Sequence, residues 1–286
     1  MKTGPKLITS SGDGVTPSSV NVKNETYRAG PVKPTLENSV DARIRLGMLT
    51  PSSNTVLEPV STAIVAELPE VSVHFGRFKV TEIALSEQAL KQFDDTEIMR
   101  AAELLAHAKV DTIAWNGTSA SWLGLDRDER LCERIIATTG IAACTSVLAF
   151  REIFQRTAAK RIGLVTPYTD DVQAKILETW KSAGMSCSAE RHSGLRDNFS
   201  FAEVDEHSIS EMIRAVKADG CDAVAVVCTN MRVAPVTAAL ETELGIPVYD
   251  SIAAAVWKSL LLAGADPRRV NAWGSLFQDQ RLSVRT

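Results

Sequence analysis

Two stretches of the chain share one pattern and decide the fold: Asp222-Ala-Val-Ala-Val-Val-Cys228-Thr229-Asn230 and Asp111-Thr-Ile-Ala-Trp-Asn-Gly117-Thr118-Ser119. Each begins with an aspartate, continues as an apolar run of strand length and ends in small polar residues. This pattern is typical of a buried β-strand followed by a loop. When the two stretches are aligned, Cys228 corresponds to Gly117, so the earlier stretch carries no thiol where the later one does.

The correspondence extends along the chain. Residues 161–170 match residues 45–54 position by position, and residues 244–251 echo residues 139–146. Three matched landmarks in the same order indicate a duplication that produced two similar halves.

The predicted fold is α/β with two pseudo-symmetric lobes. A strand is predicted over residues 71–78, and helices over 55–68, 86–109, 126–138 and 147–157. Strands that alternate with helices predict a parallel sheet in each lobe, with helices on both faces and ligands at the carboxyl ends of the strands. We expect a flexible tail over residues 1–40, a first lobe over 41–150 and a second lobe over 151–286, whose C-terminal helix packs back on the first lobe. The natural active site is the cleft between the lobes.

Composition excludes several classes of partner. The formal net charge of −4 and the absence of a basic run argue against nucleic acid and anionic membranes. No segment approaches the ~20 continuous apolar residues of a membrane span. The odd count of five cysteines fits a reducing compartment, so we expect a cytoplasmic protein. A homodimer or higher homo-oligomer is the default assembly.

Cys228 is the first candidate for catalysis. It ends a strand before a polar loop that could open a helix, where backbone N–H groups and the helix dipole would lower the pKa of the thiol. The alternative is an inert cysteine of the core. The other four cysteines lack such a setting, and we interpret them as structural.

Gly117, Thr118 and Ser119 form the second candidate. Their backbone N–H groups and two hydroxyls can converge on one anionic group, such as a carboxylate or an enediolate. Tyr168 places a phenol at the opposite loop, with an aromatic lid on the strand ends as the alternative interpretation.

The sequence lacks the motifs of metal sites, nucleotide-binding sites and serine hydrolases. The four histidines are not spaced to share a metal, so no metal site is predicted. Dinucleotide and P-loop glycine motifs are absent, as is the serine elbow of hydrolases. Asp170 and Asp171 are interpreted as caps of a helix.

Four motifs in this order resemble the aspartate/glutamate racemase superfamily, and within it the branch of maleate cis-trans isomerases and arylmalonate decarboxylases. They are Pro51-Ser52-Ser53-Asn54, Gly117-Thr118-Ser119, Thr-Pro-Tyr-Thr-Asp-Asp at 166–171, and Cys228-Thr229-Asn230. The resemblance covers roughly residues 43–277. It implies a cofactor-independent enzyme with the active site between two lobes.

The resemblance also implies roles for residues. Racemases and maleate isomerases of the superfamily carry one cysteine in each lobe, whereas arylmalonate decarboxylase has Gly-Thr-Ser in the first lobe and a single cysteine in the second. By this likeness Thr118, Ser119 and Tyr168 hold the carboxylate that becomes an enediolate, and Cys228 protonates it. The residues expected to bind substrate carboxylates or line the site are Pro51, Ser52, Asn54, Asn116, Asn198, Thr229 and Asn230.

The leading hypothesis is therefore a cofactor-independent decarboxylase that acts on a malonate-like dicarboxylate. The alternatives are a maleate cis-trans isomerase or racemase that uses Cys228 with Asn116 or a water, including an ectoine-utilisation relative, and a non-catalytic carboxylate-binding protein. The run Thr229-Asn230-Met231-Arg232 replaces the small glycines of the decarboxylase, so an aryl substituent does not follow. If the single thiol sets the stereochemistry, a cysteine in place of Gly117 is expected to add racemase character.

Overall fold

Two parallel four-stranded sheets form the framework of the protein in a computed structural model that describes residues 43–86 and 95–283. The first sheet has the order β2-β1-β3-β4, and the second has the order β6-β5-β7-β8. The predicted α/β fold with two pseudo-symmetric lobes is confirmed. The predicted tail and residues 87–94 of the expected helix over 86–109 lie outside the described residues.

The strands are β1 (Ile44–Pro51), β2 (Val71–Phe78), β3 (Thr112–Trp115), β4 (Ala142–Thr145), β5 (Ile162–Thr166), β6 (Cys187–His192), β7 (Ala223–Val226) and β8 (Val248–Asp250). The helices are α1 (Leu57–Ile64), α3 (Asp95–His107), α4 (Ala120–Leu123), α5 (Leu125–Thr139), α6 (Ser146–Thr157), α7 (Asp170–Ser182), α8 (Glu206–Ala218), α9 (Thr237–Leu244) and α10 (Ser251–Leu262).

The duplication is visible in matched hydrogen bonds. The carboxylate of Asp111 accepts the backbone N–H of Arg45 at 2.7 Å, at the start of β1. In the second lobe, Asp222 accepts the backbone N–H of Arg161 at 3.1 Å, at the start of β5. The aspartate that opens each of the two repeated stretches therefore ties β3 to β1 and β7 to β5 in the same way.

Helix ends repeat as well. Gly140 and Gly245 follow α5 and α9 in the left-handed conformation, with φ of 71° and 66°, where glycine avoids the strain of a side chain. Thr145 and Asp250 then cap α6 and α10 with their side chains. These matches explain why residues 244–251 echo residues 139–146 in the sequence.

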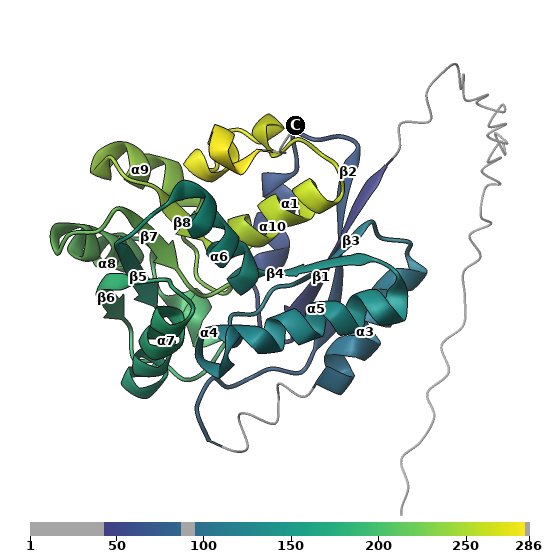
Figure 1. Cartoon of the computed structure of the whole chain (residues 1–286), viewed down its shortest axis with the longest axis horizontal. Helices are drawn as coiled ribbons and strands as arrows, with labels where there is room; N and C mark the ends of the chain where they lie inside the picture. Colours follow the sequence, from purple (N-terminus) through teal and green to yellow (C-terminus); the bar gives the residue numbers. More distant parts are fainter. Residues whose placement is uncertain (1–42, 87–94, 284–286) are drawn as a thin grey trace, which may run out of the picture. The chain divides into compact units, whose positions relative to one another are not determined.

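Helix α10 lies between the two sheets, in contact with β3 and β4 of the first and β8 of the second (Figure 1). Helices α1 and α10 contact each other over one face of the first sheet. Helices α3 and α5 contact each other over the opposite face (Figure 1). The loops after β2 and β6 also meet, through an antiparallel bridge between Glu82 and Asp197. The lobes thus share both apolar packing and backbone hydrogen bonds.

Candidate active site

Cys228, Tyr168 and Thr118 meet between the carboxyl ends of β3, β5 and β7. The Thr118 Oγ1 and Tyr168 hydroxyl oxygens are 2.6 Å apart, which joins the first lobe to the second. The Cys228 sulfur accepts the backbone N–H of Asn230 at 3.3 Å, and the same phenol is near enough to this sulfur for each group to affect the pKa of the other. All three side chains are buried, and Cys228 is 3% exposed. The thiol, the phenol and the first-lobe hydroxyl therefore form one cluster.

The expected lowering of the Cys228 pKa is wrong. Burial raises the pKa of this thiol to about 12, and the lowering effects of the Asn230 N–H and of the Tyr168 phenol offset burial only in part. The residues after Cys228 form a turn, and the next helical element is a short 3-10 helix over Ala234–Val236. No helix dipole acts on the sulfur from this loop, so the thiol keeps its proton at neutral pH.

Tyr168 is held by two aromatic neighbours. Trp122 and Phe201 pack edge-on against its ring, with ring centroids 5.3 and 5.4 Å away. Burial, followed by the proximity of Cys228, raises the pKa of the phenol well above its usual value. Tyr168 thus stays protonated and can donate a hydrogen bond in a fixed direction.

Gly117, Thr118 and Ser119 lead from β3 into the short helix α4. The carbonyls of Thr118 and Ser119 accept hydrogen bonds from the first helical turn. Within the described part of the chain, the backbone N–H groups of these two residues have no acceptor. An anion-binding role for these N–H groups stays a prediction.

Asp250 is a neighbour of the cluster that the sequence marked only as part of the repeat. One carboxylate oxygen accepts the backbone N–H groups of Ile252 and Ala253 at 2.8 Å each, which caps α10. The other oxygen is buried and has no partner among the described residues. Burial raises the pKa of this carboxyl to about 7, and its charge in turn raises the pKa of Cys228.

Several residues expected to bind substrate instead bind one another across the lobes. The Asn54 amide donates to the carbonyl and the hydroxyl oxygen of Thr229 at 3.0 and 3.1 Å. The Thr229 hydroxyl donates to the backbone carbonyl of Asn116 at 2.9 Å. The side-chain oxygen of Asn54, Oδ1, accepts hydrogen bonds from the backbone N–H groups of Val56 and Leu57, at the start of α1. Asn54 thus has both ends of its side chain engaged within the protein.

A second set of bonds continues this junction. Asn230 accepts the backbone N–H of Thr55 at 2.9 Å and donates to the Asn198 carbonyl at 2.6 Å. The Asn198 amide donates to the Ser53 hydroxyl at 2.7 Å. Ser52 lies just outside this set and bonds to the backbone of Val80. We call Asn54, Asn116, Asn198, Thr229 and Asn230 the interlobe polar network.

Pro51 and Asn116 complete the predicted site. Pro51 is the last residue of β1, and its carbonyl accepts the backbone N–H of Asn54 at 3.0 Å. The Asn116 amide nitrogen donates to the Ala114 carbonyl, while its side-chain oxygen is buried without a partner in the described chain. Hydrogen bonds across the junction of the two lobes join Thr118 to Tyr168, and Asn54 and Asn116 to Thr229. Pro51 and Ser52 lie at the carboxyl end of β1, and Gly117 and Ser119 follow β3.

The aspartates after Tyr168 do not cap α7 as expected. Thr169 precedes the helix, and Asp170 instead accepts a hydrogen bond from His192, with 2.7 Å between Oδ1 and Nε2. Glu190 binds the other ring nitrogen at 2.9 Å. Burial alone would lower the pKa of His192, but the two carboxylates outweigh it and raise that pKa.

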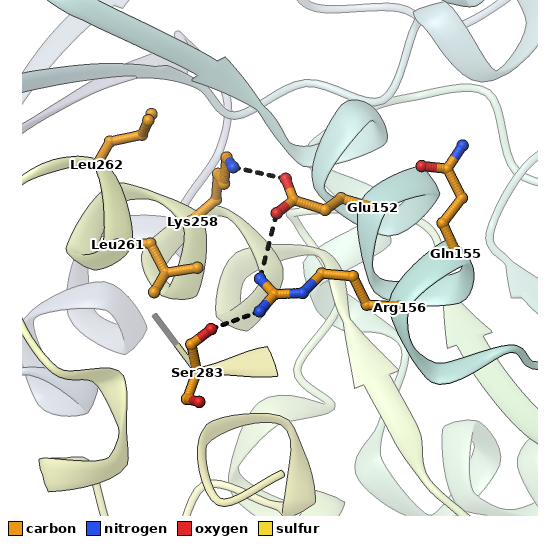
Figure 2. A pocket seen from close by; sticks show the side chains of 7 residues that line it. All are labelled: Glu152, Gln155, Arg156, Lys258, Leu261, Leu262 and Ser283. Atoms are coloured by element: carbon orange, nitrogen blue, oxygen red, sulfur yellow. Dashed lines mark hydrogen bonds and ion pairs between the residues drawn. The ribbon is translucent and has the colours of Figure 1, made fainter. Parts of the chain in front are cut away.

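A cavity of about 480 Å³ lies elsewhere, between α6 and α10 (Figure 2). Glu152 lies between its two cations and pairs with Lys258 at 2.5 Å and with Arg156 at 3.3 Å (Figure 2). Arg156 also donates to the carbonyl of Ser283. No predicted site residue lines this cavity, and its cations are already paired.

Neither a metal centre nor a membrane span is found in residues 43–86 and 95–283. Among them, no group of three His, Cys, Asp or Glu side chains could hold a metal ion. Across these same two ranges, no helix has the length and apolar character needed to span a membrane.

Comparison with known proteins identifies the family. The family model described as arylmalonate decarboxylase matches residues 53–277. The chain belongs to the arylmalonate decarboxylase family. The resemblance inferred from the four motifs is thereby confirmed, including its branch of maleate isomerases and arylmalonate decarboxylases.

Relatives within this branch carry both names. A maleate isomerase of Pseudomonas putida is 27% identical over 78% of this chain and 93% of its own length. A maleate isomerase of Geobacillus stearothermophilus is 25% identical over 76% and 90%. An arylmalonate decarboxylase of Bordetella bronchiseptica is 22% identical over 82% and 96%. The chain therefore belongs to a family of enzymes that includes isomerases and decarboxylases. Among these three relatives, two are named maleate isomerase and one arylmalonate decarboxylase.

Solved structures of this branch share the fold. The maleate isomerase of Pseudomonas putida S16 with maleate has a TM-score of 0.76 at 22% identity and covers 85% of this chain and 99% of that one. An arylmalonate decarboxylase has a TM-score of 0.66 at 19% identity, with coverages of 82% and 100%. At these identities the likeness supports the two-lobed architecture alone.

Proposed function

We propose that the protein is a cofactor-independent decarboxylase of a malonate-like dicarboxylate, with Cys228 as the proton donor. The observation that carries this proposal is the cluster of a protonated thiol, a protonated phenol and the Thr118 hydroxyl, opposite a first lobe that has Gly117 in place of a second thiol. A neutral thiol suits protonation of a carbanion better than it suits nucleophilic attack, which requires the thiolate.

The proposed reaction balances within this cluster. The bond between the α-carbon and one carboxylate breaks, CO2 leaves, and the electron pair passes to the remaining carboxylate as an enediolate. Thr118, Tyr168 and the backbone N–H groups of residues 118 and 119 would bind that oxyanion, and each donor stabilises the transition state by roughly 3 kcal/mol. The Cys228 S–H proton then moves to the α-carbon, and the resulting thiolate recovers a proton from solvent.

Maleate isomerisation is the second candidate, favoured by the names of the relatives. A related structure of the Nocardia farcinica maleate cis-trans isomerase is a cysteine-to-serine mutant with a covalently bound succinylcysteine intermediate. An equivalent covalent route here would have to use Cys228 itself, because the first-lobe position is Gly117. The sequence is also compatible with a racemase, an ectoine-utilisation relative or a non-catalytic carboxylate-binding protein.

The test is a panel of alkyl- and aryl-substituted malonates together with maleate, followed by CO2 release and fumarate formation. Release of CO2 from a malonate supports the decarboxylase, fumarate from maleate supports the isomerase, and neither product from any substrate contradicts both.

The Cys228→Ala variant tests the role of the thiol. It is expected to lose at least about 100-fold in kcat, because a positioned general acid contributes roughly 10²–10⁴-fold, while substrate affinity changes little. Cys187→Ala is the matched control, since Cys187 is a half-buried thiol of the same lobe whose pKa is also raised to about 12 by burial. Full activity of Cys228→Ala would exclude the proposed chemistry.

The sequence also predicts a cytoplasmic homo-oligomer without metal, nucleic-acid or membrane partners. These statements stay predictions.

A further inference from the structure

The indole of Trp115 lies against Gly117. Trp115 is the last residue of β3 and is 2% exposed. A Cβ atom built on Gly117 would lie 1.9 Å from Cζ2 of this indole and 2.4 Å from both Cε2 and Cη2. Real Cβ contacts are essentially never shorter than 3.0 Å. No side chain fits at position 117 while the indole keeps this place.

Packing holds the indole there. Its ring contacts the ring of Phe78, with centroids 5.1 Å apart and planes at 46°. Phe78 ends β2 and Trp115 ends β3, on either side of β1, so the two rings cover the carboxyl end of the central strand. A tilted aromatic pair of this kind is stabilising beyond the area that it buries. The ring is therefore a fixed part of the first lobe.

Position 117 is the first-lobe counterpart of Cys228. The Thr229 hydroxyl, next to Cys228, donates to the carbonyl of Asn116, next to Gly117. The two positions thus adjoin the same bond between the lobes. The volume that a first-lobe acid or base would need at position 117 is already filled by hydrocarbon.

We propose that Trp115 is a specificity-determining residue: its indole occupies the side-chain volume of position 117 and leaves Cys228 as the single proton donor to the substrate carbon. This inference rests on the proposed function for its chemical consequence, but not for the placement of the ring. It corrects the expectation that Gly117→Cys by itself adds racemase character, because the new side chain would collide with Trp115. Removal of the indole is required first.

A double-mutant cycle in thermal unfolding tests the placement without any substrate. The proteins are wild type, Gly117→Ala, Trp115→Leu and the double variant; leucine keeps apolar contact with Phe78 but lacks the outer ring of the indole. Gly117→Ala is expected to lower Tm by on the order of 5 °C, because adding a methyl group to a filled volume is destabilising. In the Trp115→Leu background the same change should leave Tm nearly unaltered. Equal losses in both backgrounds would overturn the proposal.

A second experiment tests the chemical consequence with a prochiral substrate that the wild type converts in D2O. Wild type and Gly117→Cys should each give one deuterated enantiomer, while the Trp115→Leu/Gly117→Cys double variant should raise the fraction of the opposite enantiomer by at least about tenfold. Equal racemisation by Gly117→Cys alone, or none by the double variant, contradicts the inference. If the wild type converts no substrate of the panel, the proposed function fails, and the thermal cycle still decides where the indole lies.

Discussion

At the scale of single residues, the protonation of Cys228 governs what the site can do. Burial holds the pKa of this thiol at about 12, so the sulfur is protonated at neutral pH and is a poor nucleophile. Slow alkylation near pH 7 is therefore expected of the active enzyme. Resistance to an alkylating agent does not separate a catalyst from a carboxylate-binding protein, and turnover of the Cys228→Ala variant is the measurement that does.

Asp250 supplies a prediction on pH. Burial raises the pKa of its carboxyl to about 7 in the folded protein, against about 3.9 in the unfolded chain. Between about pH 3.9 and about pH 7 the folded state therefore binds a proton that the unfolded chain has released. Asp250 does not reduce stability at low pH, but a penalty grows as the pH rises through this window and is complete above about pH 7. At pH 8 this penalty is at most about 4 kcal/mol.

Asp250→Asn removes the ionisation and keeps the oxygen that caps α10. We expect its free energy of unfolding at pH 8 to exceed that of the wild type by about 1–2 kcal/mol, because the unpaired amide takes back part of the gain. The advantage should vanish near pH 5. Urea unfolding at both pH values measures it, and an equal difference at the two values would show that the carboxyl does not titrate as described.

The sequence singled out Cys228 and its neighbours as candidates because the repeat aligned them with the first lobe, and their roles stay predictions. It could not give the direction of the Cys228 pKa, which depends on how completely both lobes bury the sulfur. The sequence could not predict the position of the Trp115 ring either, because that position depends on packing against Phe78 of another strand. The sequence does show a large ring two residues before a glycine, and a glycine at or near a strand often marks the close approach of another group.

At the scale of elements, strands were predicted better than helix starts. The strand over residues 71–78 is observed with the same bounds, and the helix expected over 126–138 is α5, one residue longer at each end. The helix expected over 55–68 is shorter, because α1 spans Leu57–Ile64. Asn54 explains the later start, since its side chain binds the N–H groups of Val56 and Leu57 before the helix begins.

Asn54→Ala should lower the free energy of unfolding by about 2–4 kcal/mol. The change removes a helix-start acceptor, worth ~1 kcal/mol, and leaves the buried Thr229 carbonyl without its donor, at ~1–3 kcal/mol. Asn271→Ala is the control, because the Asn271 amide binds an exposed carboxylate of Glu67, and its loss should stay below about 0.5 kcal/mol. Denaturant unfolding at fixed pH compares them; similar midpoints for both variants would mean that the interlobe polar network adds little stability.

At the scale of the whole molecule, three kinds of contact join the two lobes. Helix α10 packs on both sheets, the interlobe polar network crosses the junction, and the bridge between Glu82 and Asp197 adds backbone bonds. The duplication allowed the sequence to predict two lobes of equal topology. It gave no information on these contacts between them, which arise from pairs of residues far apart in the chain.

We therefore predict a single cooperative transition in urea. Far-UV circular dichroism reports on all helices, whereas fluorescence reports on buried indoles of both lobes, such as Trp115 in the first and Trp180 in the second. The two signals should follow one curve with one midpoint. Separate midpoints would show that one lobe persists after the other has unfolded.

The covalent linkage of the two halves has a consequence for how such a site can diversify. A homodimer of identical single-lobed subunits would present the same residue from both sides of its symmetry axis, so any substitution would appear twice. One polypeptide that contains both halves escapes this restriction, and the pair Gly117 and Cys228 shows the freedom in use. Handedness in the product can thus be encoded by a difference between two copies of one ancestral segment.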